Sequence, residues 1–96
     1  MIELQLQNEQ LLLTGELTRN TVNNAFEKKA ASLLSKEITL LNLSAVSKVD
    51  TAGLAWLLLV LEQKKHQLHE IHFIHIPQEL LNLAKLSAVD TFLPIK

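Results

Sequence analysis

Asp50 and Thr51 are the polar residues of this chain whose types and position could do chemistry. They stand directly before an apolar run of helical length, where the free backbone N–H groups of a helix start need acceptors. Gly53 follows two residues later, and a glycine leaves room for another backbone to approach closely. The sequence therefore predicts an exposed, polar helix start that carries a carboxylate and a hydroxyl group.

A row of histidines raises a second hypothesis, a metal site, because they recur at every third position. They are His66, His69, His72 and His75. The first is expected to end a helix and the second to lie in a loop, while the last two differ in parity along one strand and so point to opposite faces. A metal ion needs three or four converging ligands. We therefore predict no metal site and interpret these residues as surface histidines.

The residue patterns of common enzyme classes are missing from the sequence. Its only glycines are Gly15 and Gly53, so there is no phosphate-cradling glycine loop, and it has no cysteine for thiol catalysis, disulfides or metal binding. Ser44 and Ser47 lie near Asp50, but no histidine is expected nearby to activate them. The sequence predicts no catalytic residues, no cofactor and a protein that is not an enzyme.

Composition indicates one globular domain spanning residues 1–96. Apolar residues make up 48% of the chain and charged residues 20%, which argues against disorder. The net charge is −1, and the only adjacent basic pairs are Lys28-Lys29 and Lys64-Lys65. Nucleic-acid binding needs a clustered basic surface, so we expect no nucleic-acid partner.

Neither an export signal nor a membrane span is expected. The first residues, Met1 to Gln7, alternate apolar and polar and carry Glu3, whereas a signal peptide needs a basic start and an apolar block. The longest apolar run, Leu54 to Leu61, has eight residues, and a spanning helix needs roughly 20. We therefore predict a soluble, cytoplasmic protein without direct membrane insertion.

Hydrophobic periodicity predicts strands alternating with helices, and hence a single α/β domain. We expect a mixed sheet of four to five strands packed with three to four helices. Thr18 should cap the first helix, whose buried face would carry Val22, Phe26, Ala30 and Leu33. The expected segments are strands at 2–7 and 10–16, a helix at 18–34, a strand at 38–43, a helix at 51–66, a strand at 71–76, a helix from Pro77, and an extended segment at 90–96.

The helix expected at 51–66 carries two apolar stripes on roughly opposite sides. A helix that is apolar on both sides is either sandwiched within its own domain or docked against a partner. Both readings stay open here: neighbouring helices could cover the second stripe, or its tryptophan could anchor an interface. The first stripe is Leu54, Leu57, Leu58 and Leu61, and the second is Ala52, Ala55, Trp56 and Leu59.

Three segments together resemble the STAS domain, which is shared by bacterial anti-sigma factor antagonists and the tails of anion transporters. They are Gly15-Glu16-Leu17, Leu43-Ser44-Ala45-Val46 and Val49-Asp50-Thr51-Ala52-Gly53-Leu54. The resemblance covers essentially the whole chain in order and length. It implies a STAS-like fold.

With Leu83-Ala84-Lys85-Leu86 downstream, the sequence is most similar to the small cytoplasmic STAS subunits of Mla-type phospholipid-transport ABC systems. This similarity implies a subunit that binds the ABC transporter ATPase (MlaF-type), in a complex with a membrane permease at the inner membrane. It also implies a role in transporter assembly or activity that maintains outer-membrane lipid asymmetry. The residues expected to contact the partner are Asp50, Thr51, Ala52, Gly53, Ala55, Trp56 and Leu59.

Several positions depart from the pattern of the antagonists. The serine that a kinase phosphorylates in that group is Ala52 here, which has no hydroxyl, and two acidic positions are Thr18 and Asn42. Thr51 retains a hydroxyl one position earlier; it could cap the helix or contact the partner, and it is the one candidate for phosphorylation. The alternative function is an antagonist-like regulator that binds an anti-sigma factor or kinase, and the missing serine disfavours it.

Overall fold

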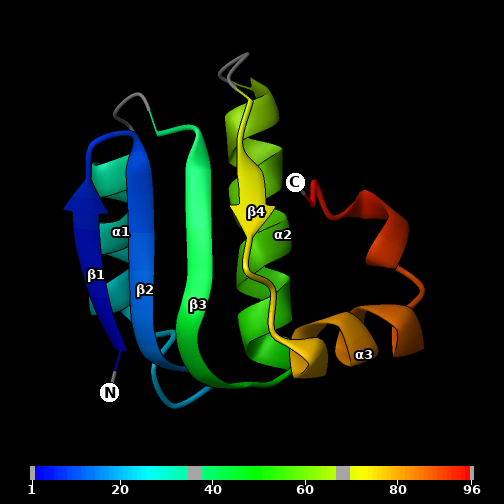
Figure 1. The fold of residues 1–96 in the computed structure, drawn as a ribbon. Helices are drawn as coiled ribbons and strands as arrows, with labels where there is room; N and C mark the ends of the chain where they lie inside the picture. Colours follow the sequence, from blue (N-terminus) through cyan, green and yellow to red (C-terminus); the bar gives the residue numbers. More distant parts are fainter. Residues whose placement is uncertain (1, 35–37, 67–69, 96) are drawn as a thin grey trace.

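A computed structural model describes residues 2–34, 38–66 and 70–95, and within them the chain forms a four-stranded sheet with helices (Figure 1). The strands lie in the spatial order β1-β2-β3-β4. This confirms the predicted α/β class. The elements are β1 (Ile2–Gln7), β2 (Gln10–Leu17), α1 (Asn24–Leu34), β3 (Leu40–Val49), α2 (Thr51–His66), β4 (His72–Ile74), α3 (Gln78–Leu86) and the 3-10 turn η1 (Asp90–Phe92).

The sheet is mixed, as the sequence predicts. β1 and β2 form the predicted hairpin, and Asn8 in its turn has a φ of 57°, a left-handed conformation that asparagine tolerates. β3 pairs in parallel with β2 on one side and with β4 on the other. α1 and α2 are the crossover helices that these parallel pairs require.

Both crossover helices cover the same face of the sheet, with α1 behind β1 and β2 and α2 behind β4 (Figure 1). The side chains that point toward them are fully buried, among them Leu11 and Leu13 of β2, Leu41 of β3 and Phe73 of β4. The core therefore lies between one sheet face and two helices. Within the described ranges, no helix is long and apolar enough to cross a membrane.

The first helix begins later than the sequence predicted, and the assignment of Thr18 as its cap is wrong. The Asn23 side chain accepts a hydrogen bond from the Phe26 amide at 2.9 Å and is the actual cap. Thr18 lies in a turn instead, where its amide donates to the Thr21 hydroxyl at 3.0 Å. That hydroxyl also donates to the Glu16 carbonyl at 2.7 Å. These local bonds satisfy backbone groups that a longer helix would have used.

Strand lengths also differ from expectation. β3 extends to Val49 because β2 pairs with it, across two register shifts, as far as Leu17. β4 has only three residues, since His75 takes a φ of 55° and leaves the strand. Pro77 is the residue before α3 rather than its first residue. The terminal segment contains η1 and then a single parallel bridge between Ile95 and Phe73, so it is more ordered than predicted.

α2 keeps its predicted bounds, but its buried side differs from either predicted stripe. Leu54, Trp56, Leu57 and Val60 are buried, whereas Leu58 and Leu61 are only half-buried. The Trp56 ring lies 4.8 Å from the Phe26 ring, centroid to centroid, in a tilted arrangement. Trp56 is therefore a core residue covered by α1. Leu59 is 47% exposed, so the reading in which neighbouring helices cover the whole second stripe is wrong for Leu59.

A lysine connects the far ends of the two crossover helices. Lys64 is buried, and its ammonium group donates a hydrogen bond to the Leu34 carbonyl at 2.5 Å, at the C-terminal end of α1. Burial lowers the pKa of Lys64. A cation at this end of a helix satisfies a free carbonyl and interacts favourably with the helix dipole.

The division of α2 into core and surface predicts unequal losses of stability for two truncations. Trp56→Ala should lower the free energy of unfolding by about 3–5 kcal/mol, because it empties a packed aromatic site. Leu59→Ala should lower it by about 1 kcal/mol or less, because nearly half of that side chain is already in water. Urea unfolding followed by circular dichroism measures both. Equal losses would contradict this assignment of core and surface.

Candidate functional site

The candidate site is the junction at which β3 ends and α2 begins, and Asp50 organises it. One carboxylate oxygen of Asp50 accepts a hydrogen bond from the Gly53 amide at 3.1 Å, which caps α2. The other accepts from the Arg19 amide at 3.0 Å, which holds the loop between β2 and α1. A single side chain thus fixes two segments that are far apart in the sequence. Asp50 performs the capping, and Thr51 is the first helical residue.

Gly53 brings the first turn of α2 against the end of β2. A Cβ atom at this position would lie 2.1 Å from the Leu17 carbonyl oxygen, closer than any nonbonded contact allows. The same carbonyl oxygen accepts a hydrogen bond from the Asp50 amide at 3.3 Å. The glycine is therefore required by close backbone approach, as the sequence predicted.

The carboxyl group of Asp50 is ionised at neutral pH. Burial by itself would raise the pKa of Asp50, but hydrogen bonds from the backbone amides of Arg19, Gly53 and Ala52, and the nearby Arg19 charge, hold it below its ordinary value. An ionised carboxylate also suits the positive end of the α2 dipole. The negative charge is thus committed to holding the junction together.

The predicted contact residues separate into an outward and an inward group. Gly53 and Trp56 are buried, and Trp56 in particular cannot serve as an exposed anchor. Thr51, Ala55 and Leu59 are exposed and lie four residues apart, which aligns them along one side of the helix. Ala52, beside them, is half-buried. We call Thr51, Ala52, Ala55 and Leu59 the α2 surface.

The histidines do not form a metal centre in the part of the chain that the structure describes. His72 is half-buried on β4 and His75 is exposed just after it, whereas His69 and the side chain of His66 lie outside the described residues. Among described side chains, no group of three or more potential metal ligands comes together.

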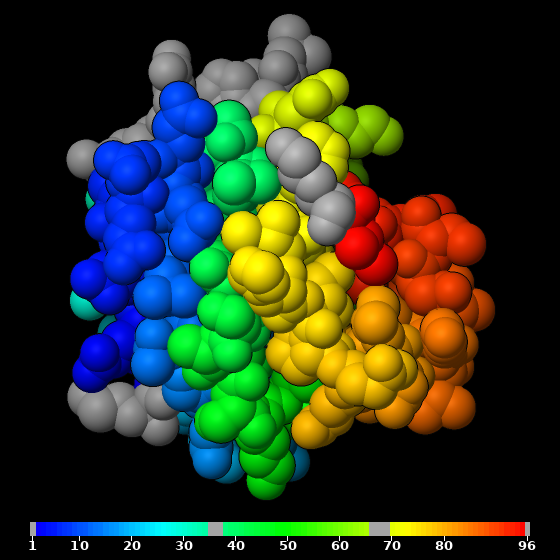
Figure 2. Space-filling view, viewed as in Figure 1, coloured from blue at the N-terminus to red at the C-terminus, as the bar shows by residue number. Residues whose placement is uncertain are grey.

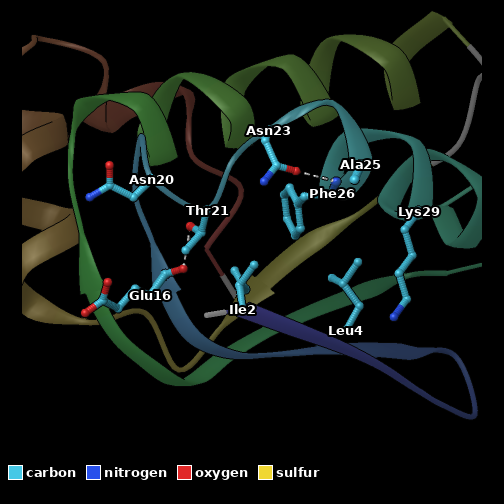
Figure 3. Close-up of a pocket in the computed structure, with 9 residues that line it drawn as sticks. All are labelled: Ile2, Leu4, Glu16, Asn20, Thr21, Asn23, Ala25, Phe26 and Lys29. Atoms are coloured by element: carbon cyan, nitrogen blue, oxygen red, sulfur yellow. Dashed lines mark hydrogen bonds between the residues drawn. The ribbon is translucent and has the colours of Figure 1, made fainter.

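A pocket of about 390 Å³ opens beside α1, and sequence reasoning missed it (Figure 3). Its apolar lining comes from Ile2, Leu4 and Phe26, and Glu16 and Lys29 are the charged residues around it. These residues belong to β1, the end of β2 and the start of α1. No local pattern could have grouped residues from such separate segments.

A second groove, of about 480 Å³, runs along the other flank of α2. Its apolar lining is Leu58 and Leu61 of the helix and Val89 and Phe92 of the C-terminal segment, and its charged lining is Glu62 and Lys65 of the helix. Phe92 is 67% exposed. The apolar part of this groove thus lies beside the α2 surface, and charged residues of the same helix border it.

The contact with Leu17 predicts a large effect of a single methyl group. Gly53→Ala should lower the free energy of unfolding by about 3 kcal/mol, because the backbone carbonyl that it meets cannot move aside without displacing β2. The ordinary gain in helix propensity from this change, about 1 kcal/mol, is smaller. Ala55→Ser on the same helix is the control and should change stability by about 0.5 kcal/mol or less. Urea unfolding decides, and an unchanged Gly53→Ala variant would refute the close approach.

The junction also predicts a pH dependence. Because folding lowers the pKa of Asp50, its carboxylate stabilises the protein above the unfolded-state value of about 4, and this stabilisation is lost as the pH falls through the folded-state value. Asp50→Asn should therefore cost about 1 kcal/mol at pH 7 and progressively less below about pH 4. Asp90→Asn is the control, because it makes the same change in net charge away from the junction. A cost for Asp50→Asn that is constant between pH 7 and pH 3 would contradict this account.

Solved structures with the same fold include regulators of sigma-factor signalling. A putative anti-sigma factor antagonist from Thermotoga maritima superposes with a TM-score of 0.77 at 17% identity, covering 98% of this chain and 84% of that one. The anti-sigma factor antagonist SpoIIAA in its unphosphorylated form gives a TM-score of 0.64 at 16% identity, covering 99% of this chain and 86% of that one. At these identities the likeness shows a shared fold.

Sequence comparison identifies the family. Two proteins are each 36% identical to this chain over 76 residues, which cover 79% of this chain and 76% of the relative. Both are named intermembrane phospholipid transport system binding protein MlaB, one from Escherichia coli (strain K12) and one from Shigella flexneri. Residues 1–94 match the family described as "Mlab, STAS domain". This chain, with its Asp-Thr-Ala-Gly-Leu junction, therefore belongs to the MlaB family of STAS domains.

Proposed function

We propose that this protein is a non-catalytic subunit of a phospholipid-transporting ABC complex and that it binds the ATPase of that complex, of the MlaF type, through the α2 surface. The similarity to proteins named for an intermembrane phospholipid transport system supports the complex. In this role the protein is cytoplasmic, is held at the inner membrane through its partner, and supports transporter assembly or activity in maintaining outer-membrane lipid asymmetry.

The observation that carries the proposal is the uncharged outward side of α2. From Thr51 through Leu61 the helix contains no charged residue; its charges begin at Glu62. A helix on the outside of a small sheet is normally charged on its solvent side. The alanines of the α2 surface let another backbone approach closely, and the exposed Leu59 supplies apolar area for a partner to bury.

Thr51 gives this surface a polar contact. Because Asp50 caps the helix, the exposed Thr51 side chain can hydrogen-bond a partner. Phosphorylation there would add roughly two negative charges next to the ionised Asp50 and would repel an acidic partner or reorganise the surface. We therefore assign Thr51 to the ATPase contact in its unmodified form.

The alternative, an antagonist-like regulator of an anti-sigma factor or kinase, has support from the fold alone. Such a switch needs a phosphorylatable serine before the glycine, and this position is Ala52. Purification from native lysate separates the two functions: a membrane-associated ABC ATPase bound to the protein supports transport, and a kinase-like ATPase supports signalling.

A bulky charge in the middle of the α2 surface tests the proposed contact. Ala55→Arg should weaken binding to the purified ATPase at least about thirtyfold, because the arginine would occupy the space that a partner backbone needs. Thr51→Ala should weaken it to a smaller extent, through the loss of one hydrogen bond. Isothermal titration calorimetry measures the affinities.

The matched control is Ala31→Arg, which adds the same side chain at an exposed position of α1. It should leave the affinity for the ATPase unchanged. If Ala55→Arg folds normally and binds as tightly as Ala31→Arg, the α2 surface is not the contact.

A further inference from the structure

The two edges of the sheet differ in how their outer backbone groups are covered. At the β4 edge, the C-terminal segment covers the strand: the Phe73 amide donates to the Pro94 carbonyl at 2.9 Å, and Ile95 forms a parallel bridge with Phe73. At the opposite edge, β1 pairs with β2 on its inner side only, among the residues that the structure describes. Figure 2 shows this strand, in dark blue, at the left rim of the molecule.

β1 lacks the features that usually prevent one sheet edge from pairing with another. Protective edges carry lysines, prolines or bulges. The described strand contains none of these residues, its register with β2 is unbroken from Ile2 to Gln7, and its single charge is Glu3. It is therefore a regular edge able to accept a further strand.

The outward backbone groups of β1 belong to its apolar residues. A hairpin closed by two residues makes the flanking residues, here Gln7 and Gln10, a hydrogen-bonded pair. Since hydrogen-bonded and non-hydrogen-bonded pairs alternate along an antiparallel ladder, the backbone groups of Ile2, Leu4 and Leu6 face the free edge. Their side chains point to the helix side, where Leu6 remains 41% exposed.

We propose that β1 pairs with β1 of a second copy of this chain, antiparallel and across a twofold axis at Leu4, to form one continuous sheet. In this register Leu4 lies opposite Leu4 of the other copy, and Ile2 lies opposite Leu6. Those are the residues whose backbone groups are directed outward, so each pair can exchange two hydrogen bonds. Glu3 lies opposite Gln5, so no like charges meet.

The pocket beside α1 fits the same arrangement. Ile2 and Leu4 form part of its apolar lining, on the helix side of β1 (Figure 3). The exposed Leu6 of the second copy, opposite Ile2, lies on that side of the sheet and next to the pocket. Each copy thus supplies one exposed leucine and one hollow whose β1 side is apolar, which is the self-complementarity that a twofold interface requires.

The pairing is limited in area and leaves the α2 surface free. A strand edge with its neighbouring side chains falls below the roughly 1,200 Å² of a stable interface, so the dimer dissociation constant should be micromolar or higher. β1 and α2 lie toward opposite ends of the sheet (Figure 1). The second copy therefore does not compete with the partner proposed for α2.

Two substitutions at the fully outward position Gln5 test the register. Gln5→Glu places a carboxylate opposite Glu3 of the other copy, and the twofold axis makes this like-charge pair occur twice. The substitution should therefore raise the dimer dissociation constant about tenfold at low salt. Gln5→Lys creates two opposite-charge pairs and should lower it several-fold. Sedimentation equilibrium of the full chain, over about 1 µM to 1 mM, measures the constant. Gln63→Glu, at an exposed position of α2, is the control and should have no effect.

Opposite shifts for the two Gln5 variants, both reduced at high salt, support the proposed pairing. A protein that stays monomeric over the whole range overturns it. So does a dimer that responds to Gln5→Glu no more than to Gln63→Glu, because it must then use another surface. Equal weakening by both Gln5 variants overturns the register.

Discussion

The contact between the first turn of α2 and the Leu17 carbonyl is the constraint on which the rest of this structure depends. A helix can come so close to a strand end only where it has no side chain, and Gly53 provides that position. The Leu17 carbonyl also binds the Asp50 amide, and Asp50 in turn binds the Arg19 and Gly53 amides. Strand β2, its following loop, strand β3 and helix α2 therefore meet through one backbone carbonyl and one carboxylate.

This junction determines the rotation of α2 about its own axis. With Gly53 against β2, the positions one and two turns later face the sheet, and Leu57 and Val60 are buried there. The opposite side of the helix must then face outward, and it carries Ala55 and Leu59. The core thus accounts for the apolar residues on one side of α2 only, and the uncharged opposite side is the surface on which the proposed partner contact rests.

The sequence correctly predicted those features that depend on neighbouring residues alone. The bounds of α2 and the hairpin follow from periodicity and turn residues, and the Asp-Thr-Ala-Gly-Leu segment pointed correctly to the junction. The predicted start of α1 was wrong because the Thr21 hydroxyl binds the Thr18 amide and the Glu16 carbonyl. Hydrophobic periodicity carries no information about such side-chain hydrogen bonds. The position of Trp56 could not be predicted, since it depends on Phe26, a ring brought to it by the fold. For the same reason, the pocket and the free edge became visible only with the sheet assembled.

The geometry of the junction does not depend on which side chain stands at position 52. Asp50 and Gly53 are needed for the geometry of the junction, whatever the protein binds, because one caps α2 and the other permits its approach to β2. Ala52 is the position where the phosphorylated serine would stand, and no contact of the junction requires a hydroxyl there. Fold and phosphorylation switch are therefore separable within one short segment. The outward residues between the structural ones are small or apolar apart from one threonine, and they can vary without disturbing the contacts that hold the junction together.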